Sequence, residues 1–343
     1  MRRPIRLAIA AAAALTALAF TSSAWAIYTP RLIATSLTNG PGRPTTMLLG
    51  HVQTPDDDAT FRDQIFVPLG YGVNLSAPVN TKIGDVSATL ILRQAGNAQV
   101  DVEGTVVADN PALYTAQAQQ CTQSPTPPDA VWRLDVTVAG SPTRVPIYVN
   151  RTTGPEATFA AAKIQFCLSA PTVSPGAQLL FALFDVNNVF TSPANTTDRV
   201  WRSVFVPYAP GTGTPNLGQS AEGQALVPGR VSLTLTSKSL KRGRVILSGR
   251  LLVDGRPFPG ATIDLYVGQR RVGRVRTNRA GRYTFRKRIR KKTRYQTLVT
   301  VVGDLPAPPC AVTTPPFATA QGCKTTTISF VAASRRVTAR RRR

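Results

Sequence analysis

The chain has 343 residues, and its 41 Lys and Arg residues against 17 Asp and Glu give a formal net charge of +24. With one histidine and no GxSxG, HExxH, Walker A or strand-linked GxGxxG motif, the sequence gives no indication of a histidine-rich zinc site, a phosphate-binding loop or a common hydrolase. A Ser-His-Asp triad would depend on His51 in the strand-like run LLGHVQT, where we expect a surface or strand-edge histidine.

Residues 1–26 predict a cleaved signal peptide. A basic start with Arg2, Arg3 and Arg6 precedes an apolar run over 7–20, and Ala24-Trp25-Ala26 forms a small-residue cleavage site. The run is shorter than the roughly 20 residues that span a bilayer, although an uncleaved anchor remains the alternative. We therefore expect a secreted protein, free or associated with the cell envelope, without a transmembrane segment in the mature chain.

Charge divides the mature chain into two parts. Residues 27–227 carry 11 Lys/Arg and 14 Asp/Glu, a net of −3, whereas residues 228–343 carry 27 Lys/Arg and 3 Asp, a net of +24. The Pro/Gly/Ser/Thr-rich stretch between them predicts a linker. We predict an N-terminal domain over 27–209, a linker over 210–227, a C-terminal domain over 228–332 and a basic disordered tail over 333–343.

Short β-branched and aromatic runs with period-two alternation fill the N-terminal domain. They favour an all-β fold, an antiparallel β-sandwich, over alternating strands and helices. No run beyond the signal peptide has a convincing helical period. The expected strands are 46–54, 85–92, 98–107, 131–138, 144–149, 158–168, 178–184 and 198–206.

The C-terminal domain predicts a second sandwich, in which DGRPFPG, GQRR and NRAGR separate the strands. Seven strands in about 100 residues are typical of immunoglobulin-like or transthyretin-like (prealbumin-like) sandwiches. The expected strands are 231–236, 244–253, 261–267, 272–277, 283–289, 295–302 and 325–331.

The stretch SGRLLVDGRPFPGATIDLYVGQRRVGRVRTNRAGRYTF resembles the carboxypeptidase regulatory-like fold, which has a "dG.PvpGA.V.L" turn and strand followed by a "T...G.Y.F" segment. The resemblance covers about 40 residues and implies a non-catalytic β-sandwich module. The N-terminal domain looks like uncharacterised exported actinobacterial proteins, which implies no activity. The matching residues are Gly249, Leu251, Gly255, Pro257, Pro259, Gly260, Ala261, Ile263, Leu265, Thr277, Gly281, Tyr283 and Phe285.

The four cysteines predict structural disulfides, because an even count in an exported chain favours pairing. Proximity favours Cys121–Cys167 and Cys310–Cys323, one pair per domain, among three possible pairings. Neither pair has the CxxC spacing of a metal or redox site, so we expect no metal and no cofactor.

Carboxylates offer few other sites. Asp56-Asp57-Asp58 suits calcium by charge but lacks the spacing of an EF-hand loop, and a solvated turn is the simpler interpretation. Glu103, Glu156 and Glu222 show no spacing typical of a glycosidase pair. We also expect no internal isopeptide bond, because the C-terminal domain has few acids and one asparagine.

Alternation in the C-terminal domain predicts a cationic patch, with two arginine rows adjacent on one sheet face because NRAGR would form a hairpin. Such a patch suits acidic envelope polymers or anionic lipid surfaces, whereas nucleic acid is disfavoured because few aromatics are interleaved. A solvated face that only confers solubility is the alternative. The candidate polyanion-binding residues are Arg270, Arg271, Arg274, Arg276, Arg286, Arg288 and Arg290.

These features favour an exported, non-enzymatic structural or binding protein of the cell envelope. The competing hypotheses are a secreted enzyme, for example a carbohydrate-active hydrolase with its site in the N-terminal domain, and a ligand-free structural spacer. The sequence gives no indication of a particular partner or oligomeric state.

Overall fold

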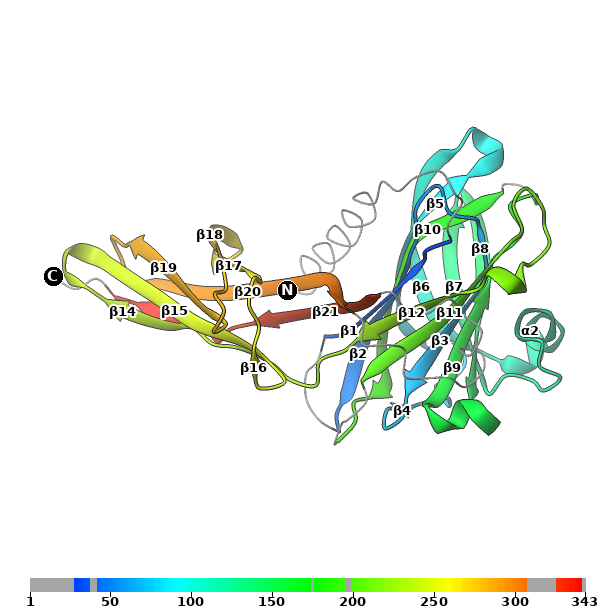
Figure 1. Ribbon diagram of the computed structural model, residues 1–343, viewed down its shortest axis with the longest axis horizontal. Helices are drawn as coiled ribbons and strands as arrows, with labels where there is room; N and C mark the ends of the chain where they lie inside the picture. Colours follow the sequence, from blue (N-terminus) through cyan, green and yellow to red (C-terminus); the bar gives the residue numbers. More distant parts are fainter. Residues whose placement is uncertain (1–27, 38–41, 174–175, 195–198, 307–324, 341–343) are drawn as a thin grey trace. The chain divides into compact units, whose positions relative to one another are not determined.

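The computed structural model describes residues 28–37, 42–173, 176–194, 199–306 and 325–340, and its fold is all-β with a sandwich architecture (Figure 1). The described residues fall into two compact units. The N-terminal unit contains described residues of 28–227 and 303–328, and the C-terminal unit contains those of 228–302 and 329–340.

One continuous antiparallel sheet forms the N-terminal unit. Hydrogen-bonded neighbours follow the order β1-β2-β10-β5-β6-β7-β8-β9-β3-β11-β12, and the short β4 pairs with the end of β10. The strands are β1 (Arg31–Ser36), β2 (Pro44–Val52), β3 (Thr60–Pro68), β4 (Gly72–Val73), β5 (Lys82–Leu92), β6 (Ala98–Asp109), β7 (Ala130–Val138), β8 (Ser141–Arg151), β9 (Ala160–Cys167), β10 (Ala177–Thr191), β11 (Val200–Pro207) and β12 (Ala221–Leu226).

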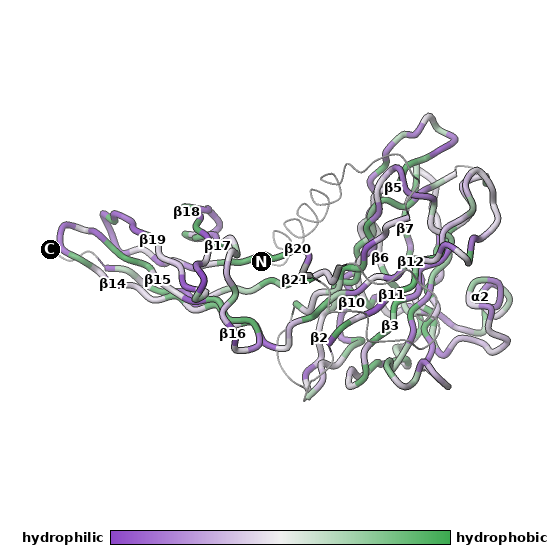
Figure 2. Tube along the Cα trace, in the orientation of Figure 1, coloured by the Kyte–Doolittle hydropathy of each residue, from purple (hydrophilic) through white to green (hydrophobic). Residues whose placement is uncertain are grey.

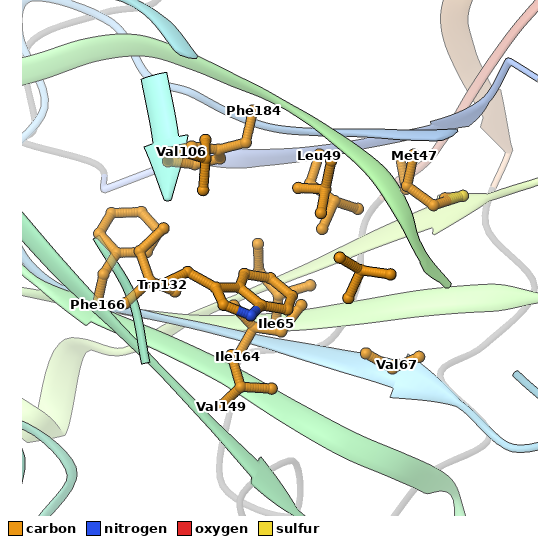
Figure 3. Close-up of a cluster of buried hydrophobic side chains, with 14 of the residues drawn as sticks. Met47, Leu49, Ile65, Val67, Val106, Trp132, Val149, Ile164, Phe166 and Phe184 are labelled. Carbon is orange, nitrogen blue, oxygen red and sulfur yellow. The ribbon is translucent and has the colours of Figure 1, made fainter. Parts of the chain in front are cut away.

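The core of this unit lies between inward-facing rows of the curled sheet, because alternate residues of each strand point to the same side. Figure 3 shows Leu49 of β2, Ile65 of β3, Trp132 of β7 and Phe166 of β9 converging in this core. Each such side chain contributes about 1.5–3 kcal/mol by leaving water. Apolar burial therefore holds the opposing parts of the sheet together.

Helix α2 (Thr115–Thr122) departs from the sequence prediction, which placed no helix beyond the signal peptide. Its run TAQAQQCT has no apolar period, and only Ala118 and Cys121 are buried. Tertiary bonds hold it instead: Cys121 forms the predicted disulfide with Cys167, with a Cα–Cα distance of 5.7 Å, and the guanidinium of Arg62 donates to the Cys121 carbonyl at 3.1 Å. Cys310 and Cys323 lie outside the described residues.

In the part of the chain that the structure describes, the other helical segments are short 3₁₀ turns. Among the described residues, no helix is both long and apolar enough to cross a membrane. The turns are η1 (Arg93–Ala95), η2 (Pro111–Tyr114), η3 (Gly154–Thr158), η4 (Leu217–Gln219) and η5 (Lys241–Gly243).

Part of the predicted linker, residues 210–227, is strand β12, which pairs with β11 along its whole length. Its run AEGQAL lacks a recognisable strand pattern because small residues occupy the inward positions. A Cβ on Gly223 would lie 2.6 Å from the Ser203 hydroxyl and 2.8 Å from the Phe205 ring. Close packing therefore selects glycine where a strand pattern would show a β-branched residue.

Two sheets form the C-terminal unit. In one, β15 pairs with β13, β14, β16 and β19; in the other, β17 pairs with β18 and β20, and β20 pairs with β22. The strands are β13 (Val231–Leu233), β14 (Thr236–Ser239), β15 (Arg244–Val253), β16 (Arg256–Pro257), β17 (Thr262–Val267), β18 (Arg270–Arg276), β19 (Arg282–Arg288), β20 (Thr293–Pro306), β21 (Thr325–Ala333) and β22 (Val337–Ala339).

The expected inward residues of this unit are in place. Ile263 and Leu265 of β17 are fully buried, and Tyr283 and Phe285 of β19 are buried with their rings in edge contact. Gly281 has the expected positive φ, 68°, before β19 begins. The strand prediction for this part of the chain is therefore confirmed, with differences of a few residues at the ends.

The chain boundaries of the C-terminal domain differ from the predicted 228–332. The described residues of 303–328 belong to the N-terminal unit, where Thr327 and Ile328 of β21 pair in parallel with Ala225 and Leu226 of β12. The predicted disordered tail is also partly strand, since β22 pairs with the start of β20 and buries Ala339. The composition predicts neither the pairing of β21 with β12 nor that of β22 with β20, because both depend on partners distant in sequence.

Candidate polyanion-binding surface

The turn from β18 to β19 decides where the predicted arginine rows lie. Thr277 remains with the β17 sheet, where its backbone N–H donates to the Ala261 carbonyl at 2.9 Å. Four residues later the Gly281 carbonyl accepts from Leu251 N, which places the following strand on β15. A Cβ on Gly281 would lie 2.4 Å from the Leu251 oxygen, so this change of sheet requires glycine.

The expected hairpin between the two rows is therefore wrong. β18 pairs with β17, whereas β19 pairs with β15, so Arg274 and Arg276 lie on one sheet and Arg286 and Arg288 on the other. Figure 1 shows β19 beside β15, and Figure 2 shows hydrophilic residues recurring along β18 and β19. NRAGR crosses between the sheets of the sandwich, a connection whose loop resembles a hairpin loop in composition.

An acid partly neutralises the row on β18. The Arg274 guanidinium donates to Asp264 from Nε at 2.8 Å, and Arg271 lies 3.8 Å from the same carboxylate. Asp264 raises the pKa of Arg274 by hydrogen bonding and charge. Arg276 and Arg270 are exposed at the two ends of β18.

The outer face of β14, β15 and β19 differs in composition from β18. Alternation buries Leu247 and Phe285 and turns their neighbours outward, and the register places Arg244 opposite Arg288 and Arg250 opposite Arg282. Side chains directly opposite each other across antiparallel strands have Cβ atoms about 4.5–5.5 Å apart. We name this surface the basic face; its cationic residues are Lys238, Arg244, Arg250, Arg282, Arg286 and Arg288.

Among the described residues of the C-terminal unit, no carboxylate lies on the basic face. Residues 228–343 contain three acids: Asp264 lies on the other sheet, the Asp254 carboxylate accepts from the backbone N–H of Arg230 at 2.7 Å, and Asp304 belongs to the N-terminal unit, where it pairs with Arg31. The like-charged pairs across β15 and β19 therefore repel one another without a protein counter-ion on their face. A bound anion would relieve this repulsion.

Arg286, Arg288 and Arg290 are exposed, as the alternation predicts, and their role in binding polyanions stays a prediction. Arg244, Arg250 and Arg282 are not among the residues predicted from the sequence. The alternation in RVILSGR was the available signal, because its buried residues Val245 and Leu247 leave Arg244 and Arg250 on the opposite side.

His51 is not at a surface or strand edge. It lies in β2 between β1 and β10, is fully buried, and contacts the ring of Phe205 edge-on at 4.8 Å between centroids. Its Nδ1 lies 3.3 Å from an Asp63 carboxylate oxygen and its Nε2 lies 3.0 Å from the side-chain oxygen of Gln53. Burial raises the pKa of Asp63, and the bond to His51 opposes that rise.

Polar side chains enclose the imidazole inside the core. The Gln53 amide nitrogen donates to the Asp58 carbonyl, so the Gln53 oxygen faces His51 Nε2, while Asp63 faces Nδ1. Both ring nitrogens therefore have a polar neighbour, as buried polar groups require.

Asp57 has a structural role in the loop between β2 and β3. Its carboxylate accepts from the backbone N–H groups of Thr29 at 2.9 Å and Thr54 at 2.7 Å, and from the Thr54 hydroxyl at 2.9 Å. Among the described residues, no three His, Cys, Asp or Glu side chains are grouped as metal ligands. The loop is a hydrogen-bonded turn rather than a cluster of convergent carboxylates.

The three glutamates have different chemical environments. Glu156 forms an ion pair with Lys163 at 2.8 Å, Glu103 is exposed on β6, and Glu222 is half-buried on β12. Burial raises the pKa of Glu222 to about 7, and Arg202 opposes the rise.

Comparison with known proteins finds no family model and no curated protein that matches the chain. The resemblance to the carboxypeptidase regulatory-like fold therefore remains an expectation from the sequence.

Proposed function

We propose that this protein is an exported, non-enzymatic binding protein of the cell envelope, and that its C-terminal unit attaches to anionic polymers by charge. The observation that carries the proposal is the basic face. There Arg244 lies opposite Arg288 and Arg250 lies opposite Arg282, and no carboxylate of the described residues of the C-terminal unit lies on the same face. Repulsion of this kind destabilises a sheet unless an anion offsets it.

Two further observations support the proposal. The positive excess is confined to residues 228–343, whereas the mature N-terminal part has a net charge of −3. The Cys121–Cys167 disulfide suits an oxidising compartment outside the cytoplasm. Both agree with a signal peptide at residues 1–26.

The residues on which the enzyme hypothesis depended have other roles. His51 is enclosed in the core beside Asp63, and the Asp57 carboxylate accepts hydrogen bonds from Thr54 of its own loop and from the Thr29 backbone. Neither side chain is placed to receive a substrate. A spacer without a ligand is a further alternative, and it predicts no function for the basic face.

The test is retention of the whole protein on purified envelope of the source organism, measured against salt concentration. We expect tight retention at low salt and steep release between about 50 and 300 mM, because exposed charges are screened over that range. The variant Arg286→Ser/Arg288→Ser should release at lower salt. Absence of retention at low salt would contradict attachment by charge and favour the spacer.

A further inference from the structure

The arrangement of charge on the basic face indicates the shape of its partner. The pair Arg244/Arg288 stands at one end of the β15–β19 ladder and the pair Arg250/Arg282 at the other. Arg288 lies six positions after Arg282 on β19, which corresponds to about 20 Å along the strand. A small anion can reach one pair only, whereas a linear polymer lying along the strands can reach both.

The first pair lies in the more strongly charged part of the chain. Lys238 of β14 and Arg286 of β19 both face Ile246 of β15 on the same outer side, and Arg290 continues beyond Arg288. The second pair is more firmly held, because the Arg250 Nε donates to the Ala280 carbonyl at 3.1 Å. The end with Arg244 and Arg288 thus has the higher density of positive charge, and the end with Arg250 and Arg282 has an arginine held by a hydrogen bond to the backbone.

Hydroxyl-bearing residues occupy the space between the two pairs. Ser248 faces Thr284 across the strands, and Thr236 of β14 faces Ser248 from the other side. No aromatic residue stands among the outward residues of this ladder, so the face has no platform on which nucleic-acid bases could stack. Hydroxyl groups suit a partner that carries hydroxyls between its charges.

Opposed guanidinium groups favour phosphate over carboxylate. Arginine binds both anions through a two-pronged contact. A phosphodiester shares one negative charge between two non-bridging oxygens on a tetrahedral phosphorus, so forks from neighbouring strands can approach it from different sides. A carboxylate has both oxygens in one plane and is matched by a single fork.

From these observations we infer that the basic face binds a linear polyol-phosphate polymer of the cell envelope, laid along β15 and β19 and engaging both arginine pairs. This inference rests on the proposed function and adds the class, orientation and minimum length of the ligand. The sheet that carries Asp264 has no part in it.

The experiment titrates the whole protein with oligo(glycerol phosphate) probes at 150 mM salt, one probe shorter than about 20 Å and one at least twice that length. We expect the long probe to bind at least 10-fold more tightly per molecule, because only it reaches both pairs. Arg244→Ser/Arg288→Ser and, separately, Arg250→Ser/Arg282→Ser should lower its affinity to that of the short probe. Equal affinity for both probes would overturn the inference.

The matched control is Arg271→Ser/Arg276→Ser, which removes the same charge from the other sheet and should change the affinity less than 3-fold. The variant Arg244→Lys/Arg288→Lys keeps the charge but removes the two-pronged guanidinium contact. We expect it to bind the long probe about 3-fold more weakly than the unmodified protein, which is half of the tenfold difference on a logarithmic scale. Thermal unfolding of each variant checks the fold. If the control loses as much as the face variants, binding is diffuse attraction and the inference fails.

Two further probes decide the class of polymer: polygalacturonate represents a carboxylate polymer and single-stranded DNA a nucleic acid. The affinity of each is compared with that of an oligo(glycerol phosphate) of equal charge. Tighter binding of either would overturn the phosphate assignment. Failure of every polyanion to bind, even at low salt, would instead refute the proposed function itself. The two failures are therefore distinguishable.

Discussion

The imidazole of His51 and the carboxylate of Asp63 face each other inside the N-terminal unit, 3.3 Å apart between Nδ1 and the nearer oxygen, and both side chains are fully buried. Asp57 and Asp58 lie near Tyr28, whose hydroxyl contacts Thr60, and Thr60 in turn donates to Gln53. Gln53 and the Phe205 ring contact the imidazole, whereas the second Asp63 oxygen, Oδ1, has no hydrogen-bond partner among the described residues.

Removing the histidine alone should destabilise the protein strongly. We expect His51→Leu to lower the free energy of unfolding by about 3–5 kcal/mol, because it leaves the Asp63 carboxylate buried without its partner. The double variant His51→Leu/Asp63→Leu should recover much of that loss. Urea unfolding measures both, and a double variant no more stable than the single one would contradict this account.

Asp63 also predicts a pH dependence. Burial raises the pKa of Asp63 above its unfolded value of about 3.9, so the folded state holds a proton that the unfolded chain has released. Stability should therefore fall as pH rises from about 4 toward the folded pKa. Asp63→Asn should remove that part of the slope in urea midpoints measured from pH 4 to 8, and an unchanged slope would assign it to other groups.

Glu222 predicts a second, separable effect of pH. Its pKa rises from 4.5 to about 7 on folding, because burial disfavours the charged form. The stability cost appears as pH rises above 4.5 and is complete above 7. Glu222→Gln should raise the free energy of unfolding by about 1–2 kcal/mol at pH 8, after allowance for solvent screening, and by nothing near pH 4. A gain that persists at pH 4 would indicate a packing effect.

The Cys121–Cys167 disulfide closes a loop with a sequence separation of 46. By loop entropy, Cys121→Ala/Cys167→Ala should lower the free energy of unfolding by about 4 kcal/mol. Helix α2 has few apolar contacts, so its amides should lose hydrogen-exchange protection before the strands do. Simultaneous loss of protection in α2 and β9 would show that the helix does not open independently.

Close packing at Gly223 predicts a cost for one added methyl group. Gly223→Ala places a Cβ 2.6 Å from the Ser203 hydroxyl, and we expect a loss of about 1–3 kcal/mol. Ser203→Ala in the same chain should restore part of it. Gly303→Ala is the matched control, because a Cβ there has no neighbour within 4 Å; an equal loss in the control would point to the backbone rather than to packing.

Much of the fold could be predicted from alternation alone. The runs at 131–138 and 244–253 became β7 and β15 almost unchanged, because each has one buried and one polar side. Strand β3 was missed, since most of TFRDQIFVP is buried on both sides and its polar residues break the alternation. Helix α2 was missed because a disulfide, not an apolar stripe, holds it.

The candidate site was predicted in composition but not in arrangement. Which strands pair is a property of the folded sandwich, and the stretch from Arg274 to Arg286 contains no local feature that distinguishes a hairpin from a crossing between sheets. The opposition of Arg244 and Arg288 joins residues 44 positions apart in sequence (288 − 244), beyond the range of any local pattern.

The path of β21 has a mechanical consequence. The chain enters the C-terminal unit after Val227, leaves it after Val302 and returns after Ile328, so three covalent crossings join the two units. A pull on the C-terminal unit is divided among these crossings, and a single protease cut at one of them does not detach it. Two units joined at three points stay covalently connected after damage that would separate units joined by one linker.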